Sequence, residues 1–423
     1  MTKISATRHP SGLTILTAEV PQMASVSVGL WVGTGGRYEP AELNGVAHFL
    51  EHMLFKGTAS RSAREISQAV EGIGGYLNAF TSEEHTCFYS KALHDRFGDL
   101  LEVLMDLLLH PRLAAADLEL EREVVKEEAA FCFDDPQQHV QELINETLWP
   151  DHPLGRPLTG TVKTLNPMRR EHLRAFHRQH YVAANTVVAA AGHLTHAQVV
   201  RAVVRHARHF PIGPRPPYLP LVSRQTRPRV RLFTKDVAQT QLALSLRTCP
   251  RQDGRRFALR LLNTILGENM SSRLFQKLRE DRGLAYHIQS SVSFFHDAGT
   301  LDISAGLDAE NVPEALRLIL RELRLLAEQP PPKGELKRAR DYLLGQMALS
   351  LENTESQMNL LGEQWLGFGN LIPVEEIQRN LAAVTAREIQ AVAHEFVQPD
   401  RLNLAAVSPL KSTRRLERLL NSW

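Results

Sequence analysis

A proline-rich segment, FPIGPRPPYLP at residues 210–220, divides the chain into two halves of similar length. Proline at this density is typical of an extended linker, because each proline fixes φ and removes a backbone hydrogen-bond donor. We therefore predict an N-terminal domain at 1–211, a linker at 212–226 and a C-terminal domain at 227–423.

The two halves repeat one order of expected elements. Each begins with two strand-like segments, which are GLTILTAEV and SVSVGLWVGTG in the first half and RVRLFTKD and TQLALSLRT in the second. Two helical segments, two further strands and longer helices follow in both. This order predicts an α+β protein with two structurally similar domains, each a largely antiparallel sheet with helices packed on one face.

Composition excludes several classes of protein. The 49 Lys and Arg residues nearly balance 47 Asp and Glu residues, so nothing favours nucleic acid or an anionic membrane as a partner. Three widely spaced cysteines do not suggest a disulfide framework. The N-terminal residues lack the apolar core of a signal peptide, and no stretch is as apolar as a membrane span. We expect a cytoplasmic protein.

The segment HFLEH, residues 48–52, concentrates polar groups in an otherwise apolar stretch. On a helix of 3.6 residues per turn, His48 and His52 lie one above the other and can bind one metal ion. A catalytic zinc has three protein ligands and one open position, so a third ligand must come from elsewhere. Glu51 lies beside the pair and could serve as the general base that takes a proton from water.

An accidental motif is the alternative, since the chain has 18 histidines. However, Val46, Ala47, Phe49 and Leu50 surround the polar residues, which predicts a helix buried on nearly every side. Ionisable groups in such a helix are costly unless something satisfies them, and a metal ion would do so. We therefore favour a metal site with one zinc per chain.

Two other histidine pairs, His177 with His180 and His206 with His209, are spaced by about one turn on basic helical segments. No carboxylate accompanies either pair. We interpret them as parts of exposed helix faces rather than as ligands.

The chain resembles the pitrilysin, or inverzincin, family of zinc metallopeptidases. Among these it is most similar to the short two-domain members, such as the mitochondrial processing peptidase β subunit and its bacterial relatives. The resemblance spans most of the chain and rests on the segments HFLEHMLFKGT, GGYLNAFTSEEHTCFY, EREVVKEE, HPLGRPLTGT and SSRLFQKLREDRGLAY. It implies a zinc endopeptidase that cleaves extended peptides.

The resemblance also implies the remaining metal-site residues. In the family a glutamate far beyond the second histidine is the third ligand, and Glu128 stands at that position. The adjacent Glu127 is the alternative. Glu121 matches an auxiliary acidic residue of the family and is expected to support the site without binding the metal.

Other residues are assigned to the substrate by the same resemblance. Arg279 and Tyr286 match a family pair that faces the zinc, with Tyr286 expected to bond the oxyanion. Asn78 lies in a segment that resembles the family's substrate-binding edge strand. Processing peptidases have two acidic residues where this chain has Gln138 and Glu142, so we expect Glu142 to contact substrate without strict selection of arginine.

Two interpretations stay open. The chain is either an active peptidase or a catalytically silent structural or binding subunit of the same fold, and the complete set of His48, Glu51, His52 and Glu128 favours the active enzyme. We expect a homodimer, with a heterodimer that includes a sister subunit as the alternative.

Overall fold

The computed structural model describes residues 2–422, and the chain forms two compact units. The first unit combines the chain up to Ala130 with Arg156–Leu219 and Ala348–Leu371. The second unit combines Phe131–Gly155, Pro220–Met347 and the chain from Ile372 onward. None of the helices within residues 2–422 is long and apolar enough to cross a membrane.

A six-stranded sheet in the order β1-β2-β6-β3-β5-β4 forms the centre of the first unit. Neighbouring strands are antiparallel except β2 and β6, which are parallel. Strand β4 therefore lies at an edge of the sheet. The strands are β1 (Lys3–Arg8), β2 (Thr14–Glu19), β3 (Ser25–Val32), β4 (Tyr76–Thr81), β5 (Thr86–Leu93) and β6 (Thr186–Gly192).

The second unit has a five-stranded sheet in the order β7-β11-β8-β10-β9, in which only β7 and β11 are parallel. This order corresponds strand for strand to β2-β6-β3-β5-β4 of the first sheet. The predicted α+β class with two similar, largely antiparallel sheets is confirmed. The strands are β7 (Arg229–Thr234), β8 (Thr240–Thr248), β9 (Ala285–Phe294), β10 (Gly299–Leu307) and β11 (Leu402–Ser408).

One face of the first sheet is covered by helices that share a single apolar core with it. Local sequence sets the ends of these helices. For example, Ser62 and Glu65 form a capping box at the start of α2. The helices are α1 (Val46–Leu54), α2 (Ala63–Glu71), α3 (Phe97–Leu109), α4 (Ala115–Asp134), α6 (Val162–Leu165), α7 (Arg170–His180) and α8 (His196–Ala207).

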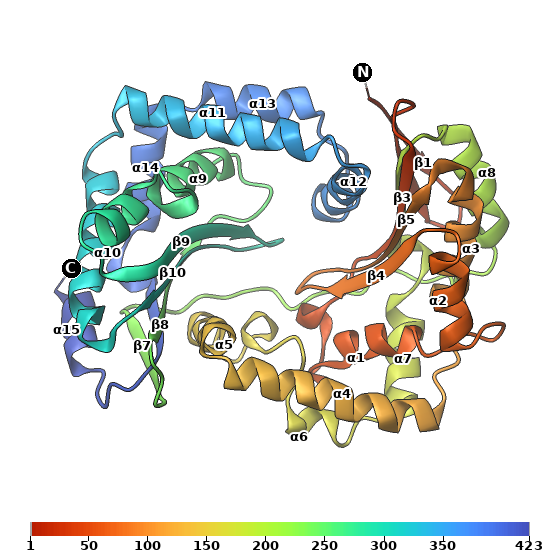
Figure 1. Ribbon diagram of the computed structural model, residues 1–423, viewed down its shortest axis with the longest axis horizontal. Coiled ribbons are helices and arrows are strands. Elements are labelled where there is room, and N and C mark those ends of the chain that lie inside the picture. The colour runs from red at the N-terminus through yellow and green to blue at the C-terminus, as the bar shows by residue number, and fades with distance from the viewer. Residues whose placement is uncertain (1, 423) are drawn as a thin grey trace. The chain divides into compact units, whose positions relative to one another are not determined.

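The other face of the first sheet is not open, which the sequence interpretation did not anticipate. Helix α12 (Thr354–Phe368) from the second half of the chain packs on it, opposite α3 and α8 (Figure 1). Close packing depends on small residues, because a Cβ at Gly362 would lie 2.3 Å from the Trp31 ring and one at Gly29 would lie 2.4 Å from Met358 Sδ. Burial on both faces explains why β3 is buried along nearly its whole length.

The second unit has the reciprocal arrangement. Helix α5 (Pro136–Leu148) from the first half of the chain packs on β8 and β11, where Val140, Leu143 and Ile144 contact Ala405 and Val407. Asp135 starts α5, since its carboxylate accepts from the backbone N–H groups of the two residues after Pro136. Each sheet is therefore covered on its second face by a helix from the other half of the chain.

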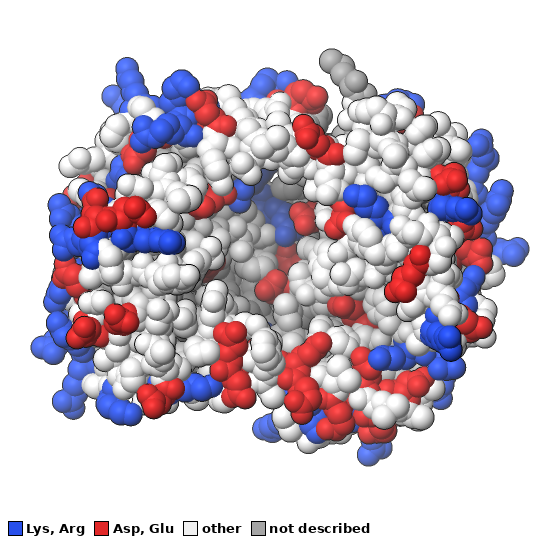
Figure 2. Space-filling model, in the orientation of Figure 1, with Lys and Arg blue, Asp and Glu red and all other residues white. Residues whose placement is uncertain are grey.

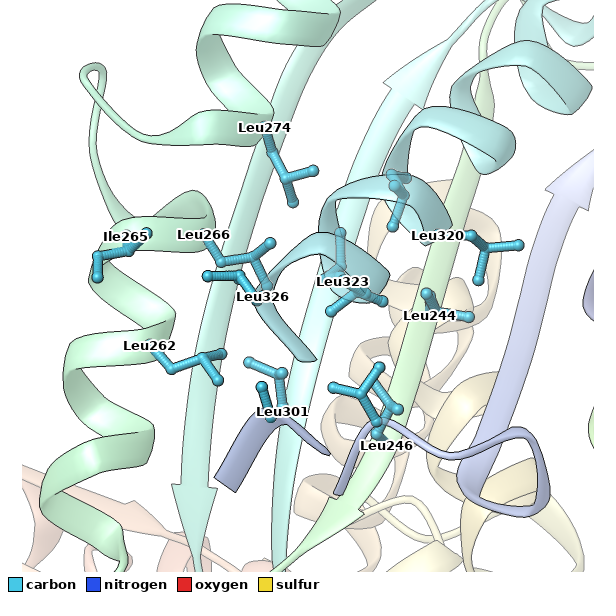
Figure 3. Packing of buried hydrophobic residues seen from close by; sticks show 14 of the residues in the cluster. Leu244, Leu246, Leu262, Ile265, Leu266, Leu274, Leu301, Leu320, Leu323 and Leu326 are labelled. Atoms are coloured by element: carbon cyan, nitrogen blue, oxygen red, sulfur yellow. The ribbon is translucent and has the colours of Figure 1, made fainter. Parts of the chain in front are cut away.

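The main core of the second unit lies on the opposite face of its sheet. Figure 3 shows Leu244, Leu246 and Leu301 of the strands facing leucines of α9 and α10. The helices are α9 (Arg256–Asn263), α10 (Val312–Glu328), α11 (Lys333–Ser350), α13 (Val374–Ala383), α14 (Ala386–Phe396) and α15 (Arg414–Asn421), with π-helical segments at Thr264–Glu268 and Phe275–Glu280.

The proline-rich segment is extended, with neither helix nor strand from residue 211 to residue 228. The predicted domain boundaries at residues 211 and 227 stay a prediction. The compact units do not follow the two halves of the chain, because α5 of the first half belongs to the second unit and α12 of the second half belongs to the first. Figure 2 shows Lys and Arg interspersed with Asp and Glu on the visible surface of each unit.

Candidate metal centre

Helix α1, which contains the HFLEH segment, is buried on nearly every side, as the sequence predicts. Of its nine residues only His48 and His52 are half-buried rather than buried. The two imidazole rings lie with their centroids 4.6 Å apart. They therefore point to the same place from successive turns.

A buried carboxylate, Glu39, holds the start of this helix in place. Its two oxygens accept from the backbone N–H groups of Gly45 at 2.7 Å and Ala47 at 2.8 Å, and from Asn44 Nδ2 at 3.0 Å. Burial, opposed by these hydrogen bonds, raises the pKa of Glu39 to about 7. Gly45 has φ of 93° and no side-chain cap of its own, so Glu39 satisfies the free N–H groups of the first turn.

Glu128 of α4 completes a group of three possible ligands with His48 and His52. Its Oε2 atom lies 3.6 Å from His48 Nε2 and 3.4 Å from His52 Nε2. Within residues 2–422 this is the one set of at least three His, Cys, Asp or Glu side chains close enough to share an ion. Glu127 is not part of it, so the geometry favours Glu128 over its neighbour.

Glu121, two turns before Glu128 on the same helix, contacts the ring nitrogen of His52 that does not face Glu128. Its Oε1 lies 2.9 Å from His52 Nδ1, and its Oε2 forms an ion pair with Lys56. A carboxylate accepts hydrogen bonds, so Nδ1 of His52 donates to Glu121, and Nε2 is the ring nitrogen directed at Glu128. Lys56, which the sequence interpretation missed, helps to orient Glu121 through this ion pair.

The protonation state of His48 also suits a metal ion. Burial, together with neighbouring His52, lowers the pKa of His48 to about 4, which keeps the imidazole neutral. Its Nδ1 is buried and has no hydrogen-bond partner among the described residues, while Nε2 faces Glu128. Two imidazoles and one carboxylate form a donor set that zinc prefers in catalytic sites. The residues present therefore fit a zinc ion.

Glu51 lies on the same helix but is not one of the three grouped residues. Its side chain is 9% exposed, and burial raises its pKa while a hydrogen bond from Thr81 opposes that rise. Thr81 Oγ1 donates to Glu51 Oε2 at 2.5 Å. Thr81 is a second residue that the sequence interpretation missed, because the contact joins the end of β4 to α1.

Arg279 and Tyr286 come together in the second unit. Arg279 lies at the end of the π-helical segment and Tyr286 on β9, and the guanidinium carbon lies 5.7 Å from the Tyr286 ring centroid. The Tyr286 side chain is 75% exposed, an unusual exposure for an aromatic residue. The two side chains therefore lie near each other within the second unit, and their action on a substrate at the metal site stays a prediction.

The two predicted substrate residues occupy different units. Asn78 lies on the edge strand β4 of the first unit and is exposed. Glu142 lies on α5, which belongs to the second unit, so it is not grouped with the possible metal ligands. Burial raises the pKa of Glu142, and no cation pairs with it within residues 2–422.

The prediction that the other two histidine pairs lie on exposed helix faces was wrong for His177 and His180. His180 is 4% exposed, stacks on Phe176 and bonds Thr34 through Nδ1, and His177 contacts the Leu108 carbonyl through Nε2. Helix α7 places this pair toward the core, and hydrogen bonds rather than a metal ion satisfy both side chains.

Comparison with protein families agrees with the geometry. Residues 14–162 match the model described as insulinase (peptidase family M16), and residues 167–343 match the one described as peptidase M16 inactive domain. An uncharacterized zinc protease of Mycobacterium tuberculosis is 38% identical over 98% of this chain and 95% of its own length. The chain belongs to peptidase family M16.

Other relatives extend this comparison. The uncharacterized zinc protease YmxG of Bacillus subtilis is 34% identical over 94% of this chain and 97% of its own. A crystal structure of a protease from Helicobacter pylori superimposes with a TM-score of 0.91 at 22% identity, covering 97% of this chain and all of the other. The two-domain M16 fold is shared, and the three possible ligands lie within the insulinase match.

Proposed function

We propose that this M16 protein is a zinc-dependent endopeptidase that cleaves extended, unfolded peptides. The position of Glu51 is the observation that carries the proposal. A buried carboxylate held by Thr81 lies on the same helix as His48 and His52, next to the group that fits zinc. A site built only to bind a metal has no need of this additional buried acid.

The residues divide the chemistry between them. Zinc, when bound, lowers the pKa of a water molecule to about 7. Glu51 takes the proton from the attacking water and later passes it to the leaving amine. Tyr286 donates a hydrogen bond to the substrate carbonyl oxygen as negative charge develops there, and Arg279 holds a substrate carbonyl or C-terminal carboxylate.

Strand β4 is suited to holding the peptide. As an edge strand it has main-chain N–H and C=O groups that an added strand can bond. Asn78, exposed on this strand, contacts the bound backbone. Glu142, a partly buried carboxylate with no cation partner in the described part of the chain, accepts a basic side chain of the substrate. With Gln138 in place of a second acid, the preference for basic residues is weak.

We expect unfolded chains to be cleaved at least about tenfold faster than the same chains when folded, because a folded protein already pairs its backbone internally. The measurement is the rate of cleavage of one small domain in its native form and as a permanently unfolded variant. Chelation followed by zinc addition serves as the control for metal dependence. Equal rates for the two forms would rule out edge-strand recognition, and no metal-dependent cleavage of any peptide would favour a silent subunit.

We further propose that the chain works as a homodimer. The family resemblance implies that zinc from one half of a longer chain acts with an Arg–Tyr pair from the other half. This chain contains both sets of residues, so zinc from one protomer could meet Arg279 and Tyr286 of its partner. The high exposure of Tyr286 suits a side chain that acts outside its own unit.

Mixing two inactive variants tests this arrangement. Glu51→Gln lacks the base, and Arg279→Ala with Tyr286→Phe lacks the oxyanion contacts. A mixed dimer has one complete site, so we expect about half the wild-type activity per mixed dimer if the sites act independently. The measurement is peptide cleavage after subunit exchange, with each variant alone as the control. If mixing restores nothing, the site lies within one chain or needs a sister subunit.

A further inference from the structure

The second unit contains a polar cavity of about 370 Å³. Its volume falls within the range of small-molecule sites. All of its walls come from the second unit, so it is distinct from the His48–His52–Glu128 group of the first. The lining residues are Trp149, Leu221, Ser223, Gln225, Arg247, Thr248, Asp297, Ala298, Asp400 and Arg401.

Two arginines in this cavity lack a carboxylate partner within residues 2–422. Arg247 is 8% exposed and donates only to the carbonyl oxygens of Leu148 and Asp400, each at 3.4 Å. Arg401 donates only to the carbonyl oxygen of Arg247, also at 3.4 Å. These are long contacts for a guanidinium.

A different arginine of the same unit provides a comparison. Arg273 forms two bonds to the Glu335 carboxylate, at 2.8 Å and 2.7 Å. This bidentate geometry is what a partly buried guanidinium prefers. Arg247 is no less buried than Arg273 and yet has no such partner, so its donors remain available for an anion that enters the cavity.

Two buried polar atoms of the same lining also lack partners. Within residues 2–422, Thr248 Oγ1 and Gln225 Oε1 make no hydrogen bond, although both residues are only 9% exposed. Gln225 is nonetheless held in place, since its Nε2 donates to the carbonyl oxygens of Arg227 and Leu402. Buried polar groups without partners carry a free-energy cost, which a bound molecule would remove.

Arg247 and Arg401 supply the positive charge of a lining that also includes Asp297 and Asp400. Burial, with Arg229 and Arg401 nearby, lowers the pKa of Arg247 to about 10. Asp297 is already engaged, because its Oδ2 accepts from the Leu221 backbone N–H at 2.8 Å. Asp400 is exposed. The lining therefore presents guanidinium donors without a carboxylate partner, a hydroxyl group and one free amide oxygen to a bound molecule.

We propose that this cavity binds a small oxyanion that also has hydroxyl groups. Arg247 and Arg401 donate to the anionic oxygens of the ligand. The Thr248 hydroxyl bonds an anionic oxygen or a ligand hydroxyl, and Gln225 Oε1 accepts from a ligand hydroxyl. Phosphate esters and hydroxy acids share this chemistry. The proposal does not depend on peptidase activity, and a catalytically silent chain would bind the same ligand.

The test is calorimetric titration of the full-length protein with glycerol 3-phosphate, glycerate and inorganic phosphate at constant ionic strength. We expect saturable binding at one site per chain. Each titration is repeated on metal-free protein, because phosphate also binds zinc. Binding that remains after metal removal belongs to the cavity. Comparison of the dissociation constants of glycerol 3-phosphate and glycerate shows whether the cavity prefers a phosphate or a carboxylate.

Variants assign the binding to the cavity. Arg401→Gln and Thr248→Val should each weaken it about tenfold, whereas Arg317→Gln, which removes an exposed arginine of the same unit, should have no effect. Thr248→Val keeps every charge and decides the question if Arg401→Gln does not fold. Dissociation constants weaker than about 10 mM for all three compounds, loss of binding with the metal, or equal effects of the three variants would overturn the proposal.

Discussion

Replacement of Glu51 by glutamine is expected to abolish peptide cleavage while the protein keeps one zinc per chain. Glutamine has nearly the same shape and still accepts a hydrogen bond from Thr81, but it cannot take a proton at neutral pH. General-base catalysis contributes roughly 100- to 10,000-fold, so kcat should fall by about that factor. His48, His52 and Glu128 remain, and metal analysis should give the wild-type content.

A matched control comes from α4. Glu123 is exposed and pairs with Lys126, so Glu123→Gln removes the same charge without touching the site. Its kcat and zinc content should both match those of the wild type. If Glu51→Gln kept substantial turnover, or lost zinc as readily as a ligand variant, the assignment of Glu51 as the base would be wrong.

The second large effect is expected for Glu128→Gln, which should weaken zinc binding itself. The carboxylate supplies the only negative charge among the three grouped side chains, and a neutral amide oxygen replaces it poorly. Loss of an outer-shell partner of a metal ligand costs about 10- to 100-fold in affinity, so loss of a ligand should exceed 100-fold. Competition with a chromogenic chelator measures the change.

The adjacent residue provides the control for this variant. Glu127→Gln removes an identical group one position earlier and should leave zinc affinity unchanged, because Glu127 is not grouped with the histidines. Glu121→Gln should have an intermediate effect of about 10- to 100-fold, since it weakens the contact to His52 Nδ1 and removes the ion pair with Lys56 but leaves the three grouped side chains in place. Equal losses in the Glu127 and Glu128 variants would mean that the third ligand is misassigned.

Much of the metal centre could be predicted because it depends on local spacing. His48 and His52 are one helical turn apart, and the apolar residues around them indicate burial whatever the rest of the chain does. The choice of Glu128 needed family resemblance, because spacing along the chain does not determine which carboxylate of α4 faces α1. Thr81, Lys56 and Glu39 could not be found this way, since each acts through a contact between segments whose patterns look ordinary.

The sequence by itself determined the local features of this protein. It specified the alternation of strands and helices in each half, the extended linker and the buried helix with two histidines on one face, because these depend on periodicity and on proline. Only the tertiary structure decided that α12 covers the first sheet and α5 the second. Helix periodicity shows that a face must be buried but not against which sheet, and here the partner depends on distant residues, such as Gly362, which leaves room for Trp31.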